Sequence, residues 1–136
     1  MGVETKVPFP KTNHTSVEGD IKINLNVVAG IVRLAVQQVK GVHSVGGGLV
    51  EGIAEIFSKK DLERGVRVSE SDKGNYVIEV KVTLFFGSEL VKVGEMIQQA
   101  VSENVFNMTH KQVERVDVVI DGVRTESSGK EEKGVS

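Results

Sequence analysis

The stretch from Tyr76 to His110 constrains the fold most, because its hydrophobic period changes once along it. In residues 76–86 apolar side chains recur at every second position, which is typical of a strand with one buried face. After Gly87 and Ser88 they recur at spacings of three and four, which predicts a helix with one apolar stripe. The positions are Tyr76, Ile78, Val80, Val82, Leu84 and Phe86 in the strand, and Leu90, Val93, Ile97, Val101, Val105 and Met108 in the helix. A strand and a helix that share an apolar side form half of an α+β core.

The break between this strand and this helix carries local start signals. Ser88 is a suitable N-cap, because its hydroxyl can accept a hydrogen bond from a free backbone N–H of the first turn. Glu89 suits the positive end of the helix dipole. We therefore expect Gly87 to form a turn and the helix to begin directly after Ser88.

A first helix is predicted upstream, in residues 27–39, from a wide apolar face. Asn24 or Asn26 can cap its start, and Gly41 suits the C′ position, where a positive φ is common. Gly30 lies inside this helix at a cost of up to about 1 kcal/mol relative to Ala. Such a glycine predicts close packing at that point.

The remaining elements are short. Residues 66–70 and 76–86 are joined by a Ser-Asp-Lys-Gly-Asn turn, which predicts a hairpin. Further strands are predicted at 42–45 and 113–123, a short strand or edge segment at Asp20–Ile23, and a short helix or docked loop at 49–60. The main order is helix, strand, strand, strand, helix, strand. This order predicts a two-layer α+β sandwich, with two main helices on one face of a small, mainly antiparallel sheet.

The 136 residues are enough for a single domain with loose ends. Residues 1–18 are polar and contain both prolines, so we expect a flexible lead-in. Residues 19–123 form the predicted α+β domain. Residues 124–136 are charged and contain Gly and Ser, which predicts a disordered tail.

Composition excludes several classes of function. The chain has no cysteine, so disulfides, thiolate nucleophiles and cysteine-based metal sites are excluded. A net charge of −2 gives nucleic acids no general attraction, and 4% aromatic residues leave few platforms for stacked bases. No apolar run approaches the roughly 20 residues that span a bilayer, and the N-terminus does not have the pattern of a signal peptide.

No group of residues has the spacing of a catalytic, metal or cofactor site. Gly46-Gly47-Gly48 lacks the Gly-Lys-Ser/Thr that ends a phosphate-binding loop, so we interpret it as a linker. Asp117 and Asp121 stand four residues apart on one predicted strand, about 13 Å, which is too far for an acid–base pair. The histidines fall in three unrelated elements, at His14, His43 and His110. We therefore expect no enzyme activity and no cofactor.

Three apolar residues alternate onto the otherwise polar side of the predicted strands: Val77, Phe85 and Val119. If the second face of the sheet is open, these residues form an apolar patch suited to self-association or to a protein partner. The alternative is that loops bury them. This patch is the predicted partner surface.

With all elements assembled, the chain resembles the alkaline shock protein family of Gram-positive bacteria, which includes the glucose-starvation stress proteins. Five fragments in the right order carry the resemblance: GDIKINLNVVAGIVRLAVQQVKGV (19–42), RGVRV (64–68), FFG (85–87), VGEMIQQAV (93–101) and MTHKQVERVDVVIDGV (108–123). His110 departs from the pattern, because the family more often has glycine there. A residue other than glycine argues against a left-handed turn at that position.

The resemblance implies a non-enzymatic cytoplasmic protein linked to cell-envelope homeostasis and stress tolerance. It also implies self-association and a membrane-anchored protein partner, which would hold the chain at the inner face of the membrane. No catalytic residues carry over from the family. Gly41, Val42, Gly87 and Thr109 match the family pattern, and we interpret them as turn and cap residues.

Two classes of function remain. The first is an interaction or scaffold protein of the envelope stress response. The second is a small RNA-binding module, because helices on a small sheet also describe KH-like domains. A KH domain clamps the RNA backbone with a GxxG loop between helices. This chain instead has three glycines followed by acidic residues at Glu51 and Glu55, which favours the first class.

Overall fold

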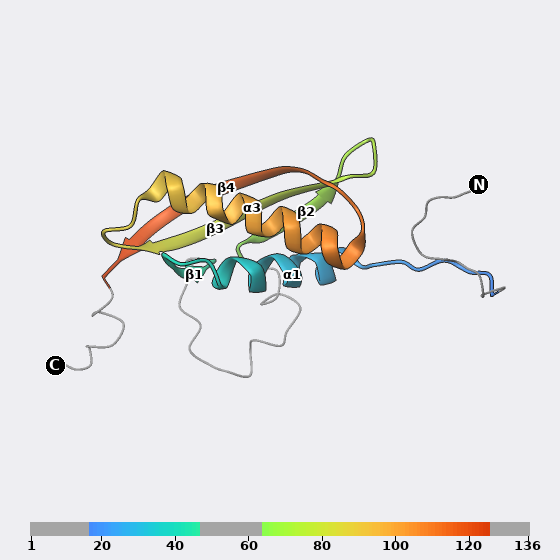
Figure 1. The fold of residues 1–136 in the computed structure, drawn as a ribbon, viewed down its shortest axis with the longest axis horizontal. Helices are drawn as coiled ribbons and strands as arrows, with labels where there is room; N and C mark the ends of the chain where they lie inside the picture. The colour runs from blue at the N-terminus through green and yellow to red at the C-terminus, as the bar shows by residue number, and fades with distance from the viewer. Residues whose placement is uncertain (1–16, 47–63, 126–136) are drawn as a thin grey trace.

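The computed structural model describes residues 17–46 and 64–125 (Figure 1). The elements are α1 (Leu25–Gln37), β1 (Val42–Val45), β2 (Val66–Glu70), β3 (Tyr76–Phe85), α3 (Leu90–Thr109) and β4 (Val113–Arg124). Their order confirms the predicted order of helices and strands. The short helix or docked loop expected at 49–60 lies outside the described residues, as do most of the expected lead-in and tail.

The long strand β3 is the centre of the four-stranded sheet. The β2 strand pairs antiparallel with residues 76–80 of β3, and β1 pairs antiparallel with residues 82–84, so both share one edge of β3. On the other edge β4 runs parallel to β3, because α3 carries the chain back to the beginning of that strand. The mainly antiparallel character of the sheet is confirmed.

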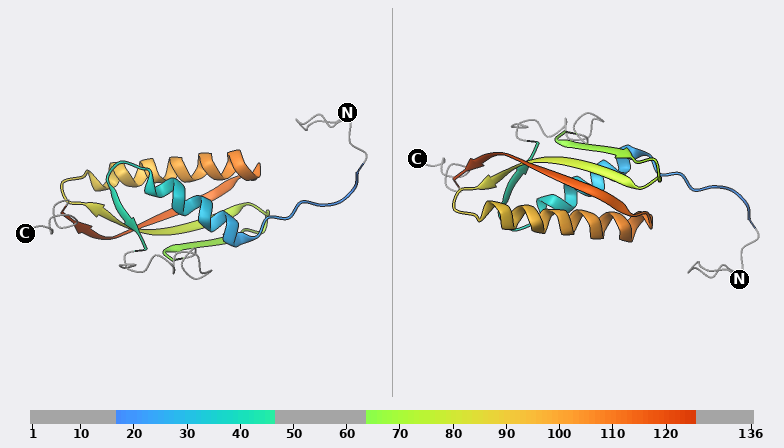
Figure 2. Two further views of the ribbon diagram at one scale, coloured as in Figure 1. Left: turned by 90° about the horizontal axis from the view of Figure 1, so that it is seen from below. Right: turned by 90° about the horizontal axis from the view of Figure 1, so that it is seen from above.

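Both helices lie on one face of the sheet, as the two views in Figure 2 show. The alternation predicted along β3 is confirmed, because Tyr76, Ile78, Val80, Val82 and Leu84 are all buried. They pack against buried residues of the helices, chiefly Val28, Val32, Val36, Ile97, Val101 and Val105. Phe86 does not follow this alternation: β3 ends at Phe85, and Phe86 is 74% exposed. The prediction that Phe86 faces the core is therefore wrong.

The start of α1 follows its local sequence. Asn24 is the N-cap, and its side-chain oxygen accepts a hydrogen bond of 2.7 Å from the backbone N–H of Asn26. The end of α1 differs from the prediction, because the helix stops at Gln37 with Gln38 as C-cap. Backbone bonds to carbonyls three residues back tighten the last turn, and they end the helix before Gly41.

Gly41 and Val42 lie at the turn between α1 and β1. Gly41 lies in the turn before β1 with φ of 104°, where an added Cβ would stand 2.9 Å from a methyl group of Val93. It is a turn residue but not the C′ residue. Val42 is the first residue of β1 and is buried, and its N–H also closes the preceding turn by donating to the Val39 carbonyl at 3.2 Å.

The start of α3 is one residue later than predicted. Glu89 is the N-cap and makes no side-chain cap bond. Ser88 belongs to the preceding turn, because its N–H donates to the Phe85 carbonyl at 3.1 Å and Gly87 adopts φ of 96°. The prediction of Ser88 as the N-cap is therefore wrong.

The end of α3 is closed by Thr109 and His110. The Thr109 hydroxyl donates to the Val105 carbonyl at 2.8 Å and accepts from the Lys111 N–H at 3.1 Å. His110 is a left-handed C-cap with φ of 61° and ψ of 25°, and its ring stacks on Phe106 at 6.0 Å. The expectation that a residue other than glycine disfavours this turn is wrong here, since histidine is among the residues that tolerate the left-handed region.

Two further expectations do not match the described chain. Asp20–Ile23 has no strand pairing, and Ile21 is 93% exposed, because no sheet edge runs beside it. An added Cβ at Gly30 would meet nothing within 4 Å, so the expected close packing at this glycine is absent from residues 17–46 and 64–125.

The strands β1 and β2 meet end to end at two glycines. Gly46 donates its N–H to the Lys81 carbonyl at 2.9 Å, and Lys81 donates its N–H to the Gly65 carbonyl at 2.8 Å. A Cβ on Gly65 would lie 2.4 Å from the Gly46 Cα, so only glycine fits there. The Arg33 guanidinium of α1 fixes this junction, because it donates to the carbonyls of Arg64 at 2.6 Å and Val45 at 3.3 Å.

Candidate interaction surface

Strand alternation determines which side chains lie on the sheet face opposite the helices. In β3 every residue with an odd number lies on this side, and the register with β2 and β4 places their side chains beside them. We call this surface the open face. Its residues are Arg67, Ser69, Val77, Glu79, Lys81, Thr83, Phe85, Arg115, Asp117, Val119 and Arg124.

All three residues of the predicted partner surface belong to the open face, and each is half-buried. They are not neighbours. Val119 lies beside Lys81 in the parallel register, whereas Val77 and Phe85 stand four residues before and after Lys81, about 13 Å away along the strand. Polar and charged side chains lie between them, so the apolar residues are dispersed, and their role in partner binding remains a prediction.

Charge on the open face is mixed. Arg67 pairs with Glu79 at 3.6 Å, and the Arg115 Nε donates to an Asp117 carboxylate oxygen at 2.9 Å. The hydrogen bond with Asp117 raises the pKa of Arg115 above its ordinary value. Within the described residues, Lys81 and Arg124 form no ion pair. The face thus carries four cations and two anions on a chain whose net charge is −2.

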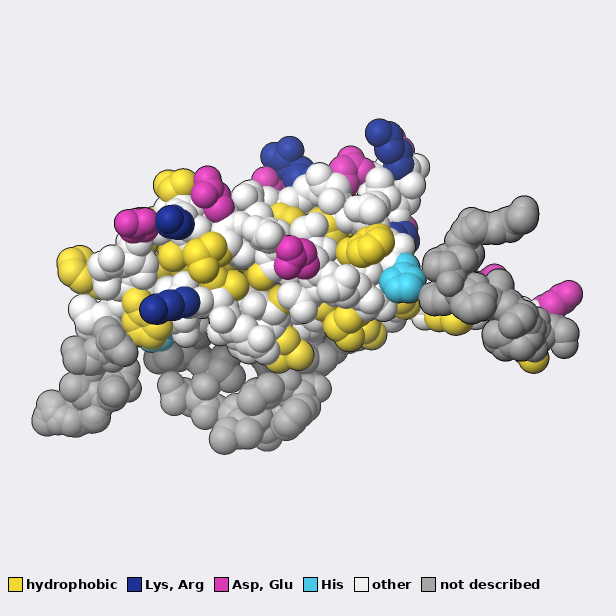
Figure 3. Space-filling model, viewed as in Figure 1, with side chains coloured by type: hydrophobic (Ala, Val, Ile, Leu, Met, Phe, Trp, Pro, Cys, Tyr) yellow, Lys and Arg dark blue, Asp and Glu magenta, His cyan; other side chains and the backbone are white. Residues whose placement is uncertain are grey.

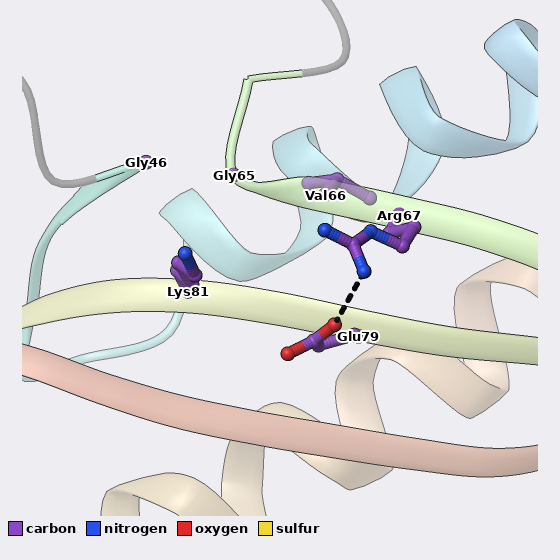
Figure 4. Close-up of a pocket in the computed structure, with 6 residues that line it drawn as sticks. All are labelled: Gly46, Gly65, Val66, Arg67, Glu79 and Lys81. Carbon is purple, nitrogen blue, oxygen red and sulfur yellow. Dashed lines mark ion pairs between the residues drawn. The ribbon is translucent and has the colours of Figure 1, made fainter.

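A shallow hollow of about 210 Å³ lies where β1 and β2 meet (Figure 4). Gly46 and Gly65 line it, and an added Cβ would stand 2.9 Å from the Arg64 Cγ at Gly46 and 2.4 Å from the Gly46 Cα at Gly65. Arg67, Glu79 and Lys81 project beside this space from β2 and β3. The hollow is smaller than the roughly 300–1,000 Å³ of most small-molecule sites, so it suits a single polar group of a partner.

A larger hollow of about 670 Å³ lies beside the start of α3. Phe85 and Met96 give it apolar walls, and Lys40 and Lys92 also line it. The His43 ring packs edge-on against Phe85, with ring centroids 5.1 Å apart. Sequence reasoning missed this site because its residues come from four segments; the only local sign was Met96, a large apolar side chain off the helix stripe.

The remaining polar candidates do not converge. No three His, Cys, Asp or Glu residues in the described ranges are grouped so that they could hold a metal ion. His43 lies in β1 and His110 at the end of α3, while His14 is outside the described residues. Asp121 is the extra residue of a β-bulge, because Ile120 pairs with Val82 and Gly122 with Thr83, so Asp117 and Asp121 do not occupy equivalent positions on one strand face.

Lys111 is the second group whose pKa shifts. Its ammonium donates to Glu70 at 2.6 Å, and this hydrogen bond, the largest cause, raises the pKa of Lys111 above its ordinary value. The ammonium also lies 4.8 Å from the centre of the Tyr76 ring. A general acid or base needs a pKa near the working pH. The shifts of Lys111 and Arg115 move away from neutrality, so both residues act as fixed positive charges.

Comparison with known protein families gives a match that covers most of the chain. A model of the alkaline shock protein 23 family, whose description states a cell envelope-related function, matches residues 13–125. That match spans every helix and strand described above. The chain belongs to this family. None of the helices in the described ranges combines the length and apolarity that a bilayer span requires.

Two relatives from Gram-positive bacteria align over most of this family member. Protein YqhY of Bacillus subtilis is 27% identical over 113 residues, which are 83% of each chain. Protein Spy1535 of Streptococcus pyogenes is 28% identical over 116 residues, which are 85% of this chain and 88% of the relative. A solved structure, MamM-CTD 215-293, covers 73% of the chain and 99% of its own at 13% identity, with a TM-score of 0.44. A likeness of that strength carries no functional argument.

Proposed function

We propose that this member of the alkaline shock protein 23 family is a non-enzymatic scaffold protein of the cell-envelope stress response. It acts by self-association and by binding a membrane-anchored protein, which holds it at the inner face of the membrane. The observation that carries the proposal is the open face, a broad sheet surface that neither α1 nor α3 covers (Figure 2).

The composition of the open face supports a protein partner. Exposed faces that combine scattered apolar side chains with both signs of charge resemble the surfaces of reversible protein complexes. Lys81 and Arg124 are available for pairing, and Glu79 and Asp117 offer acidic groups within the same surface. Because both signs occur on one face, two copies can place opposite charges against each other.

The membrane-anchored partner is proposed from the family's cell envelope-related function. A scaffold reaches the membrane through its own spanning segment, through direct contact with lipid, or through a protein that is anchored there. The described helices offer no such segment, and an anchored partner supplies it. The hollow beside α3, with Phe85, Met96 and two lysines, is a second surface for that partner.

Self-association is tested with Lys81→Glu and Val119→Asp, two changes at neighbouring positions of the open face. Light scattering across a concentration series should show assembly of the wild type, with a dissociation constant at least about tenfold weaker in each variant. The matched control is Lys22→Glu, an equal charge change outside the open face, which should leave assembly unchanged. A wild type that stays monomeric throughout the series contradicts the scaffold proposal.

Membrane recruitment is tested separately by flotation of membranes from cells that express the wild type or these variants. The wild type should float with membranes and should be released after protease treatment of membrane proteins. Binding that survives this treatment would point to lipid rather than a protein anchor. A salt-dependent shift with single-stranded RNA, absent in Lys81→Glu, would favour the KH-like alternative instead.

A further inference from the structure

The helix α1 is apolar on nearly every side. Arg33 is the only charged residue among its 13, and the guanidinium is bonded to the Val45 and Arg64 carbonyls. One side of the helix packs into the core. The other side exposes Val27 by 52% and Leu34 by 62%, with Gly30 between them. We call these three residues the outer strip; yellow side chains over α1 are visible along the lower edge of Figure 3.

The outer strip is apolar like a buried surface, but its two large side chains are more than half exposed in the described structure. A helix that is hydrophobic all round normally lies in the interior of a protein. Gly30 is unfavourable inside a helix, and an added Cβ there would meet nothing within 4 Å. Because Val27 and Leu34 lie one turn to either side of Gly30, the strip forms an apolar saddle that can receive another segment closely.

The described residues that flank the segment 47–63 lie beside α1. The segment leaves the described chain after Gly46 and re-enters it at Arg64, and Arg33 holds the carbonyls of Val45 and Arg64 beside α1. Arg33 is adjacent to Leu34 and one turn from Gly30. Leu49 is only three residues from Gly46, and three extended residues can span up to about 10 Å from that glycine. Apolar residues recur in this segment at helical spacing, namely Leu49, Ile53, Ile56 and Phe57.

We propose that the outer strip is the docking site of residues 49–57 of the same chain. A segment tied at both ends next to its site has an effective concentration in the millimolar range. A second copy of the protein must compete with that concentration, which favours the tethered segment. This inference does not depend on self-association through the open face.

Disulfide trapping tests the proposal directly, because the natural chain has no cysteine. In the full-length protein, Leu34→Cys is combined in turn with Leu49→Cys, Ile53→Cys or Phe57→Cys. Mild oxidation should close a disulfide within one chain in at least one pair, seen as faster migration without reductant and an unchanged monomer mass. A disulfide forms only where the two Cα atoms come within about 7 Å.

The control pair is Val123→Cys with Ile53→Cys, since Val123 is 48% exposed but lies on β4, at the opposite edge of the sheet from β1 and β2. Docking predicts at least about tenfold faster closure for the best Leu34 pair than for this control. Equal rates would overturn the proposal. A covalent dimer formed faster by Leu34→Cys alone would assign the strip to a second copy and would also overturn it.

A second measurement avoids cysteine. Trypsin can cut residues 47–63 at Lys59 and Lys60. If the segment docks, Leu34→Ser should accelerate cleavage there by about tenfold, whereas Val91→Ser, at a 75% exposed site on α3, should not. Equal cleavage of the wild type and both variants would contradict docking.

Discussion

At the scale of single residues, the tightest constraint lies at Gly46 and Gly65. The ends of β1 and β2 nearly touch because these strands pair with residues 82–84 and 76–80 of β3, and side chains at this junction would keep them apart. Gly65 combines a φ of 75° with a missing Cβ that would stand 2.4 Å from the Gly46 Cα. Conformation and space therefore both require glycine at position 65.

Gly65→Ala should lower the free energy of unfolding by about 3 kcal/mol or more, because left-handed strain and backbone overlap add. The matched control is Gly74→Ala in the hairpin turn, where φ is 84° but nothing lies within 4 Å of the added methyl group. That change should cost only about 1 kcal/mol. Urea denaturation of both variants measures the difference, and equal losses would show that crowding at Gly46 contributes nothing.

Residue-level features were predictable where the cause is local. The sequence narrowed the N-cap of the first helix to Asn24 or Asn26, and the structure shows that Asn24 caps it through the N–H of Asn26. Ser88 and His110 were misjudged because the residue type alone does not decide the backbone conformation at these two positions. The Ser88 N–H takes part in the turn that contains Gly87. His110 adopts a left-handed conformation, which glycine adopts more often, and its ring stacks on Phe106.

At the scale of elements, long periodic segments were predicted well and isolated short ones were not. The strand β3 and the helix α3 show their periods over ten and twenty residues. Asp20–Ile23 has strand-like composition, but a strand also needs a neighbouring edge, which sequence alone does not supply. The contact between Arg33 and the ends of β1 and β2 was also unpredictable, since its partners are backbone carbonyls 12 and 31 residues away.

Arg33→Met should lower the free energy of unfolding by about 1–2 kcal/mol, because the variant keeps the apolar stem and loses two charged hydrogen bonds. Arg67→Met is the control, since the Arg67 side chain is 81% exposed and its ion pair is long. An exposed pair of this kind contributes less than about 1 kcal/mol. Chemical denaturation gives both values, and hydrogen exchange should also rise at the Gly46 amide in Arg33→Met alone.

At the scale of the whole molecule, the sequence predicted the two layers and which residues lie on each face of β3. It did not predict that β4 runs parallel to β3 with bulges at Glu114 and Asp121. That register places Val119 beside Lys81, midway between Val77 and Phe85 of β3. The mixed charge of the open face could therefore be read only from the assembled sheet.

Lys111 connects the chain after α3 to Glu70 at the end of β2, so its charge affects global stability. Folding raises its pKa above the ordinary value of 10.5. The folded state thus holds this proton more tightly, and the resulting stability is complete below pH 10.5 and is lost as pH rises through the folded pKa. The difference in urea midpoint between the wild type and Lys111→Met should be constant from about pH 7 to 9 and should shrink in stronger alkali.

Lys73→Met, in the exposed hairpin turn, provides the reference, because it removes a lysine that forms no ion pair in the described chain. Its midpoint difference from the wild type should not change with pH in this window. If the difference in urea midpoint between the wild type and Lys111→Met grew in alkali, the predicted rise of the Lys111 pKa on folding would be contradicted.

The near-contact of Gly46 and Gly65 also has a meaning for how this chain can vary. The 17 residues 47–63 join two points of the chain that lie close together. The length of this segment is therefore not fixed by a distance that it has to span. Each doubling of the length of a flexible loop lowers the folding stability by only about 0.6 kcal/mol, through the entropy of loop closure. This junction is therefore a natural place for relatives to gain or lose sequence, or for an engineer to graft a tag, while the sheet on either side keeps its register.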